Sequence, residues 1–263
     1  MAISAADVQS LRKRTGAGML DAKKALEEAG GDAEKAAQIL REKGLAGAVK
    51  RADRENSQGA CYVSVGSNSG SIVELRCETD FVAKSESFVA LVEEIAKAVA
   101  EKGPEAVDAF TSSVDELKIT LKENIELGRV SYMRADDGEI IDGYMHLQSG
   151  RGTVGVLMKV KDGTRELAHD LALHVAFARP SYLSRKDVPE DVVENERQTL
   201  LTITRNEGKP EAALDKIVSG RLDGFFKNLC LNEQAFVKDE KLKIQDVLGK
   251  AKIVEFALVV VGA

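Results

Sequence analysis

Residues 70–100 read "GSIVELRCETDFVAKSESFVALVEEIAKAVA", a glycine followed by an apolar strand, a connector and an amphipathic helix. The apolar residues of the helical part recur at helical spacing, at Phe88, Leu91, Val92, Ile95 and Val99. Residues 152–180, "GTVGVLMKVKDGTRELAHDLALHVAFARP", repeat the same plan with weaker similarity. An internal duplication of this kind predicts two similar halves that pack together. We therefore expect an α+β fold with a two-part core.

The two copies differ in their connectors. From Leu75 to Phe88 the first copy spans 13 positions, whereas the second spans 10 from Leu157 to Leu167 and turns with polar residues. The fold can therefore make this connection without an aromatic ring, and Phe81 needs another explanation. One interpretation is that Phe81 caps the core; the other is that it anchors an interface.

The first 45 residues predict three short helices. Ser4 and Asp7 have capping-box spacing, and the glycine-rich "TGAG" (15–18) turns the chain. Asp32 is the expected N-cap of the third helix, which we expect to end at Gly44. Such a bundle is small and suited to presenting one face to a partner.

Further elements follow from residue 60 onward. Strand-like "ACYVSV" (60–65) and "SIVELRC" (71–77) flank a glycine-rich loop and predict a β-hairpin. A helix is expected over 115–127, and strands over 129–136 and 139–148, paired around the turn between them. The tail "AKIVEFALVVVGA" is strongly apolar, and we expect it to be central in the second sheet.

Residues 187–229 predict an antiparallel helical hairpin. Pro189 and Pro210 suit the beginnings of two helices, and "NEGKP" (206–210) separates them. The expected domains are a three-helix module (1–52), the first part of the core (56–140), the second part (141–182 with 230–263) and the inserted hairpin (187–229).

Composition limits the function. Hydrophobic residues make up 44% of 263, charged residues 30%, and the net charge is −6. Residues 1–54 carry +3, so the remainder carries −9, which argues against broad phosphate-backbone binding and leaves RNA or an acidic protein as partners for the basic end. No apolar run approaches about 20 residues, and we expect neither a membrane span nor a secretory signal.

Candidate catalytic groups are few. The three cysteines have no paired spacing and indicate a reducing, cytoplasmic environment. His169 and His174 are five positions apart and do not form an i, i+4 metal pair, whereas His146 ends the "GYMH" strand and could be exposed. The sequence lacks GxSxG, HExxH and GxxxxGK[ST] motifs. We expect no covalent chemistry, no cofactor and no metal.

Two stretches resemble a known family. "LRKRTGAGMLDAKKALEEAGGD" (11–32) and "CETDFVAK" (77–84) closely resemble the signature stretches of bacterial translation elongation factor Ts, and the resemblance covers essentially the whole chain. It implies an N-terminal ubiquitin-associated-like module, a two-part α+β core with internal duplication and an inserted antiparallel helical hairpin.

The resemblance also implies an activity. Elongation factor Ts is the guanine-nucleotide exchange factor of elongation factor Tu, a P-loop GTPase that binds GDP with Mg²⁺. In this family the loop that corresponds to Thr79, Asp80, Phe81 and Val82 intrudes beside the Mg²⁺ site. Phe81 is expected to wedge into the partner, and Asp80 to disturb its magnesium-binding region, in both the GDP-bound and the nucleotide-free complex.

Other partner contacts carry over by position, at Arg12, Met19, Lys23, Ile125 and His146. Gly128-Arg129 departs from the family, in which many members carry two arginines, and one charged contact is therefore in doubt. The resemblance implies a heterotetramer with the partner or a homodimer, with no membrane and no direct nucleic-acid contact. Two alternatives are an RNA- or protein-binding adaptor that uses the basic module, and a hydrolase.

Overall fold

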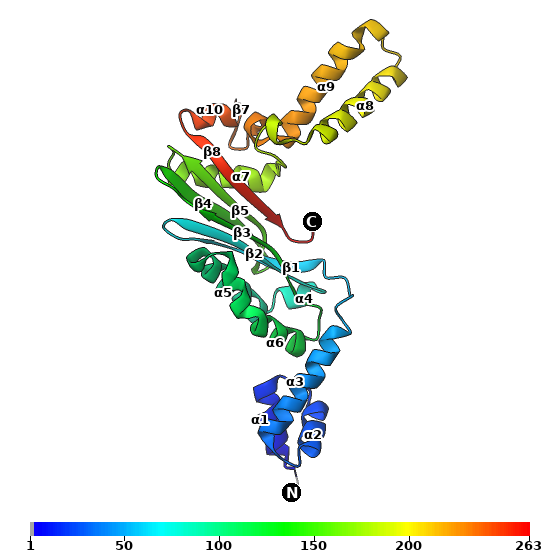
Figure 1. Ribbon diagram of the computed structural model, residues 1–263, viewed down its shortest axis with the longest axis vertical. Coiled ribbons are helices and arrows are strands. Elements are labelled where there is room, and N and C mark those ends of the chain that lie inside the picture. The colour runs from blue at the N-terminus through cyan, green and yellow to red at the C-terminus, as the bar shows by residue number, and fades with distance from the viewer. Residues whose placement is uncertain (1–2) are drawn as a thin grey trace.

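The computed structural model describes residues 3–263. Two layers of β-sheet form the middle of the molecule, and the N-terminal helices and a long helical hairpin lie at its opposite ends (Figure 1). The predicted α+β class, with a three-helix module, a duplicated core and an inserted hairpin, is confirmed.

The N-terminal module consists of α1 (Ala5–Thr15), α2 (Met19–Glu28) and α3 (Ala33–Val49). The predicted capping box is present, because Asp7 N–H donates to Ser4 Oγ at 3.2 Å and Ser4 N–H to Asp7 Oδ2 at 3.1 Å. Asp32 caps α3 as predicted by accepting from two backbone N–H groups of its first turn. The helices share a small buried core that includes Val8, Leu11, Ala25 and Leu26.

The predicted end of α3 at Gly44 is wrong, because the helix continues to Val49. A Cβ at Gly44 would lie 2.5 Å from Ile119 Cγ2 of α6 (Thr111–Leu121). Glycine is therefore required here for the close approach of two helices and does not break the helix. The predicted helix over 115–127 also corresponds to α6, which ends at Leu121 because Lys122 takes the left-handed conformation, with φ of 59°.

The first half of the core is a three-stranded antiparallel layer. Its strands are β1 (Gln58–Val65), β2 (Ser69–Cys77) and β3 (Glu126–Arg134), in the order β3-β2-β1. The helix α5 (Glu86–Lys102) covers one face, and all five of its predicted apolar positions are buried. The single turn α4 (Asp80–Ala83) precedes α5, and η1 (Pro104–Phe110) with α6 follows it.

The second half repeats this plan. Its strands are β4 (Glu139–Gln148), β5 (Arg151–Lys161) and β8 (Lys252–Val260), in the order β4-β5-β8, and α7 (Arg165–Ala178) covers them. In each half a hairpin is followed by a covering helix and then by the third strand, which pairs with the second. The predicted duplication is thus visible in the topology.

The two layers pack face to face. Their strands are joined by one bridge, Cys61 to Gly152, and a buried cluster between them contains Ile72 and Met133 of one layer and Ile141 and Leu157 of the other. This cluster is a third part of the hydrophobic core, and it lies between the cluster covered by α5 and the cluster covered by α7.

Two predicted strand positions are wrong. The strands β3 and β4 do not pair with each other: β3 pairs with β2, and β4 pairs with β5. The turn at Asp136–Gly138 therefore carries the chain from one layer to the other. Within residues 3–263, β8 pairs with β5 alone and lies at the edge of its layer, because β5 already occupies the centre between β4 and β8.

The helical hairpin is confirmed by α8 (Glu190–Asn206) and α9 (Leu214–Leu229), which project from the body in Figure 1. Arg185 holds its base: the guanidinium donates to Asp223 and Glu233 and lies 4.6 Å from the ring centroid of Phe226. Two short 3₁₀ helices accompany the hairpin: η2 (Arg185–Asp187) precedes it and η3 (Glu211–Ala213) lies between its two helices. After the hairpin the chain returns to the core through η4 (Leu231–Glu233), β6 (Ala235–Phe236), β7 (Asp239–Lys243) and α10 (Ile244–Leu248).

His174 fixes this returning segment to α7. Its ring is buried: Nδ1 accepts from Val237 N–H at 3.2 Å, and Nε2 lies 2.9 Å from Gln234 Oε1. An Nδ1 that accepts implies that Nε2 carries the proton, so the imidazole is neutral. Burial lowers the pKa of His174, which keeps it in this form.

Candidate functional site

Phe81 is the most exposed aromatic side chain of the described residues, with 84% of its surface open to solvent. It lies on α4, a four-residue helical turn in place of the expected loop, and Thr79 caps this turn by accepting from Val82 N–H at 3.3 Å. Val82 packs partly against the core under α5, and Ala83 is fully buried. The turn therefore sits firmly on the core and directs Phe81 outward, so the interpretation of Phe81 as a core cap is wrong.

Asp80 lies next to Phe81 on the same turn. Its carboxylate forms an ion pair with Lys84, one helical turn further on, and both side chains are about half exposed. The hydrogen bond from Lys84 lowers the pKa of Asp80, and the more distant charge of Arg151 acts in the same direction. Asp80 is therefore ionised at neutral pH and presents a negative charge beside the exposed ring.

Glu123 supports α4 from the connection between α6 and β3. Its Oε2 accepts from the backbone N–H groups of Glu78 at 3.0 Å and Thr79 at 3.1 Å, and its Oε1 accepts from the Thr79 hydroxyl. The Glu78 carboxylate in turn accepts from Asn124 N–H at 2.7 Å. The turn thus has a rigid support, which no sequence motif indicated, because the partners are more than forty residues apart.

A shallow groove runs beside α4. It is bordered by residues of both core halves: Gln58, Glu78, Thr79, Asp80, Phe81, Lys84, Gln148, Ser149 and Arg151. Arg151 joins the two core halves beside this groove by donating to Gln58 Oε1 at 3.2 Å and to the Gly59 carbonyl. Ser149 and Gly150, with φ of 53° and 83°, make the tight turn between β4 and β5 that brings the second half to this groove.

His146 lies two residues before this border, on β4. It is exposed, as its position at the end of the "GYMH" strand suggested, and its Nδ1 lies 3.3 Å from the Tyr144 hydroxyl. Leu147 beside it is 61% exposed, at an irregularity in the pairing of β4 with β5. Leu147 is an apolar surface residue that sequence reasoning missed.

The predicted contact at Ile125 is contradicted by its burial. Ile125 is completely buried in the core under α5, where it packs with the apolar side chains of β2 and α5. The segment "ENI" (123–125) is adjacent to α4, but its polar residues brace the site and its apolar residue points inward.

The three predicted contacts on the module, Arg12, Met19 and Lys23, are all exposed. Met19 and Lys23 are four positions apart and share one face of α2, with Leu20 beside them 65% exposed. None of these residues borders the groove at α4. The predicted contacts therefore form two separate surfaces, one on the module and one on the core.

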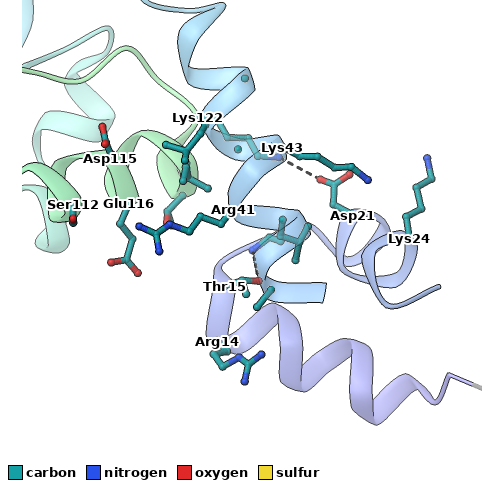
Figure 2. A pocket seen from close by; sticks show the side chains of 18 of the residues that line it. Arg14, Thr15, Asp21, Lys24, Arg41, Lys43, Ser112, Asp115, Glu116 and Lys122 are labelled. Carbon is teal, nitrogen blue, oxygen red and sulfur yellow. Dashed lines mark hydrogen bonds and ion pairs between the residues drawn. The ribbon is translucent and has the colours of Figure 1, made fainter. Parts of the chain in front are cut away.

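A cavity of about 790 Å³ lies at the junction between the module and α6 (Figure 2). Asp21 of the module and Lys122, just beyond α6, approach to 3.7 Å across it. Arg14 and Arg41 border it on the module side, and Glu116 on the α6 side. It shares no residue with α4, and its walls are the contact surfaces of two packed parts of the chain.

Within residues 3–263, no group of three or more His, Cys, Asp and Glu side chains is arranged to hold a metal ion. The three thiols are buried, and burial raises the pKa of Cys61 and of Cys77 to about 12. The same residues contain no helix that is both long and apolar enough to cross a bilayer.

An exposed aromatic ring, held on a braced turn above a rigid α+β scaffold, is typical of a protein that acts by binding another protein. Comparison with known proteins identifies the family to which this chain belongs. The chain belongs to the elongation factor Ts family: the family model described as "Elongation factor TS" matches residues 78–263.

Relatives of the same name are similar over nearly their whole length. Elongation factor Ts of Clavibacter michiganensis subsp. michiganensis is 44% identical over 99% of this chain and 98% of its own. That of Pseudarthrobacter chlorophenolicus is 43% identical over 95% and 94%, and that of Leifsonia xyli subsp. xyli is 45% identical over 94% and 93%. The chain is thus a translation elongation factor, as its motifs predicted.

Proposed function

We propose that this chain is the guanine-nucleotide exchange factor of elongation factor Tu. It binds the GDP-bound GTPase, accelerates release of GDP and leaves a nucleotide-free complex to which GTP can bind. The observation that carries the proposal is Phe81: an aromatic ring 84% exposed in the free protein, on a turn braced by Glu123, within the "TDFV" motif that the family uses as its wedge. Exposed aromatic rings on rigid supports are the kind of side chain that anchors protein–protein interfaces, which supports a role for Phe81 in binding the partner.

The proposed mechanism is mechanical and electrostatic. Phe81 inserts into the nucleotide domain of the partner, and the ionised Asp80 approaches the region that binds Mg²⁺. Mg²⁺ belongs to the partner's site, where it bridges phosphate oxygens to protein ligands, so its displacement removes the largest positive charge that holds the nucleotide. No bond is made or broken covalently, and the factor catalyses dissociation alone.

The rigidity of α4 explains why the wedge can weaken nucleotide binding. Exchange requires negative coupling: factor and GDP each lower the affinity of the partner for the other by the same ratio. A flexible ring would adapt to the GDP-bound site, whereas a ring held on a capped and braced turn forces the partner to adapt. Thr79 and Val82 thus serve the proposed wedge by holding the turn, and Asp80 and Phe81 by contacting the partner.

The two separate surfaces have separate tasks in this proposal. The module, through Arg12, Met19 and Lys23, grips the nucleotide domain away from the magnesium, while His146 and the neighbouring Leu147 contact the partner beside the groove. Ile125 is excluded from the contacts because it is buried. Whether the complex is a heterotetramer, and whether the free factor is a homodimer, stay predictions. We place the protein in the cytoplasm, where translation takes place.

The test is release of labelled GDP from purified elongation factor Tu, with excess unlabelled GDP, at increasing concentrations of this protein. We expect the release rate to rise and saturate, with excess Mg²⁺ opposing the effect. A release rate that stays at the level of elongation factor Tu alone, with the two proteins shown to be folded, would refute the proposed function. Binding of RNA by the isolated basic module, without any effect on GDP release, would favour the adaptor alternative.

A further inference from the structure

The connection between α6 and β3 joins parts of the chain that the proposed function uses separately. Glu123 makes three hydrogen bonds to Glu78 and Thr79, at the entrance of α4. A helical turn of four residues is not stable on its own, because nucleation is unfavourable and only tertiary contacts compensate for it. Glu123 therefore determines how well α4, and with it Phe81, keeps its orientation.

The adjacent residue, Asn124, acts on the other surface. Its side chain is buried, and Nδ2 donates both of its hydrogens, to the Ala52 carbonyl at 3.0 Å and to the Arg54 carbonyl at 2.8 Å. These carbonyls lie in the segment by which the chain leaves α3 and enters β1. Asn124 thus fixes the point at which the module is attached to the core.

Other contacts also hold the module to the core, and the closest is the packing of Ile119 of α6 against Gly44 of α3. Arg51 donates to the Lys118 carbonyl at 3.0 Å, and the pair of Asp21 with Lys122 in Figure 2 is 3.7 Å long and exposed on both sides. An exposed pair of this kind contributes little free energy. Asn124 adds two buried hydrogen bonds to these contacts, at the point where the module joins the core, and so helps to set the orientation of the module toward a partner.

We propose that Glu123 and Asn124 are positioning residues with separate effects on exchange. Glu123 positions the wedge and sets the maximal rate of GDP release, whereas Asn124 positions the module and sets the affinity for the GTPase. The two effects separate because Asn124 reaches Glu78 through its backbone N–H at 2.7 Å, which alanine or serine at this position keeps. This inference rests on the proposed function.

The test is GDP release from elongation factor Tu over a range of factor concentrations, with the thermal midpoint of each free variant. We expect Glu123→Ala to lower the maximal rate by about tenfold, with the half-saturating concentration within about twofold. Glu123→Gln should keep most of the rate, because its amide oxygen can accept from both backbone N–H groups and its amide can donate to the Thr79 hydroxyl.

Asn124→Ala should do the opposite, raising the half-saturating concentration by about tenfold with a maximal rate near that of the unchanged protein. Asn124→Ser, whose hydroxyl is too short to reach both carbonyls, gives the same reading if the alanine variant folds poorly. The matched control is Glu93→Ala on α5, which removes a carboxylate that accepts from the Tyr62 hydroxyl at 3.1 Å and should change neither quantity.

A combined variant tests whether Glu123 acts through α4. In the background of Phe81→Ala, Glu123→Ala should cause little further loss, since the two changes affect one element. Full additivity of these losses would overturn the inference, as would Glu123→Ala and Asn124→Ala lowering the same quantity, or Glu123→Gln losing as much rate as Glu123→Ala. If the unchanged protein fails to accelerate GDP release, the proposed function itself fails, which is a different result.

Discussion

Replacing Phe81 by alanine should separate stability from function. The ring is 84% exposed, so about one sixth of it is covered in the free protein. Truncating a fully buried aromatic costs about 3–5 kcal/mol, so the covered part of Phe81 corresponds to less than about 1 kcal/mol. For a chain of this length, a change of about 1 kcal/mol moves the thermal midpoint by about 2–4 °C. We therefore expect Phe81→Ala to lower the midpoint by less than about 3 °C.

The matched control is Phe88→Ala, because Phe88 is seven positions away and fully buried in the core under α5. It should show the full cost of about 3–5 kcal/mol and a midpoint lower by about 6–20 °C. GDP release should show the reverse order: Phe81→Ala should lower the rate at least tenfold, as expected for an interface anchor, whereas the folded fraction of Phe88→Ala should keep most of it.

The assay pairs calorimetry of the free variants with release of labelled GDP from elongation factor Tu. The reasoning would be refuted if Phe81→Ala lowered the midpoint as much as Phe88→Ala while its folded molecules exchanged nucleotide at a near-normal rate. Such a result would mean that the ring is covered in solution and that another part of the surface contacts the partner.

Four further outcomes follow from the same structure. Asp80→Ala should lower GDP release, and in combination with Phe81→Ala its effect should be less than additive, since both residues act at one site; a fully additive loss would mean separate sites. Replacing residues 190–226 by a short glycine linker should leave the rate of GDP release within about tenfold of that of the unchanged protein. The reason is that the hairpin lies at the opposite end of the molecule from the module and shares no residue with the groove at α4. A thousand-fold loss of rate with a normal circular dichroism spectrum would contradict this. Removing residues 1–52 should raise the half-saturating concentration and leave the maximal rate nearly unchanged, and titrations that show the reverse would exchange the roles of module and wedge. Because burial lowers the pKa of His174, the unfolded chain binds a proton below about pH 6.5 that the folded chain does not. The contribution of His174 to the free energy of unfolding should therefore be fully present above about pH 6.5 and decrease as the pH falls below it. Urea midpoints of His174→Gln that fall with pH as much as those of the unchanged protein would show that another group is responsible.

Local patterns predicted much of this molecule correctly. The capping box of Ser4 and Asp7, the cap at Asp32 and the helical spacing within α5 depend on neighbours within a few residues, and the structure has them as expected. The exposed ring of Phe81 could be anticipated as well, because the second copy of the repeat makes the same connection without it. Comparison of the two copies distinguished an exposed residue from a packing residue.

The wrong predictions concern positions whose structure is determined by contacts with distant parts of the chain. Gly44 lies within a helix because Ile119 packs against its bare backbone, a contact that no local pattern reveals. Ile125 was assigned by its place in a motif, but a motif identifies a segment without indicating which side chain faces outward. Glu123 and Asn124 were missed for a related reason: their partners lie 44 to 72 residues away in the chain.

The duplicated plan of the core has a consequence for how this molecule can grow. In both halves the additional chain enters at the equivalent place, between the covering helix and the third strand: η1 and α6 in the first half, the hairpin with β6, β7 and α10 in the second. Lengthening the polypeptide there leaves the pairing of all three strands untouched, because the closing strand returns to the same neighbour whatever precedes it. In the first half the added chain includes α6, against which the N-terminal helices pack, and in the second half it includes the projecting helical hairpin. A reporter domain inserted at the tip of that hairpin, near Gly208, should therefore leave the strand pairing of both halves unchanged.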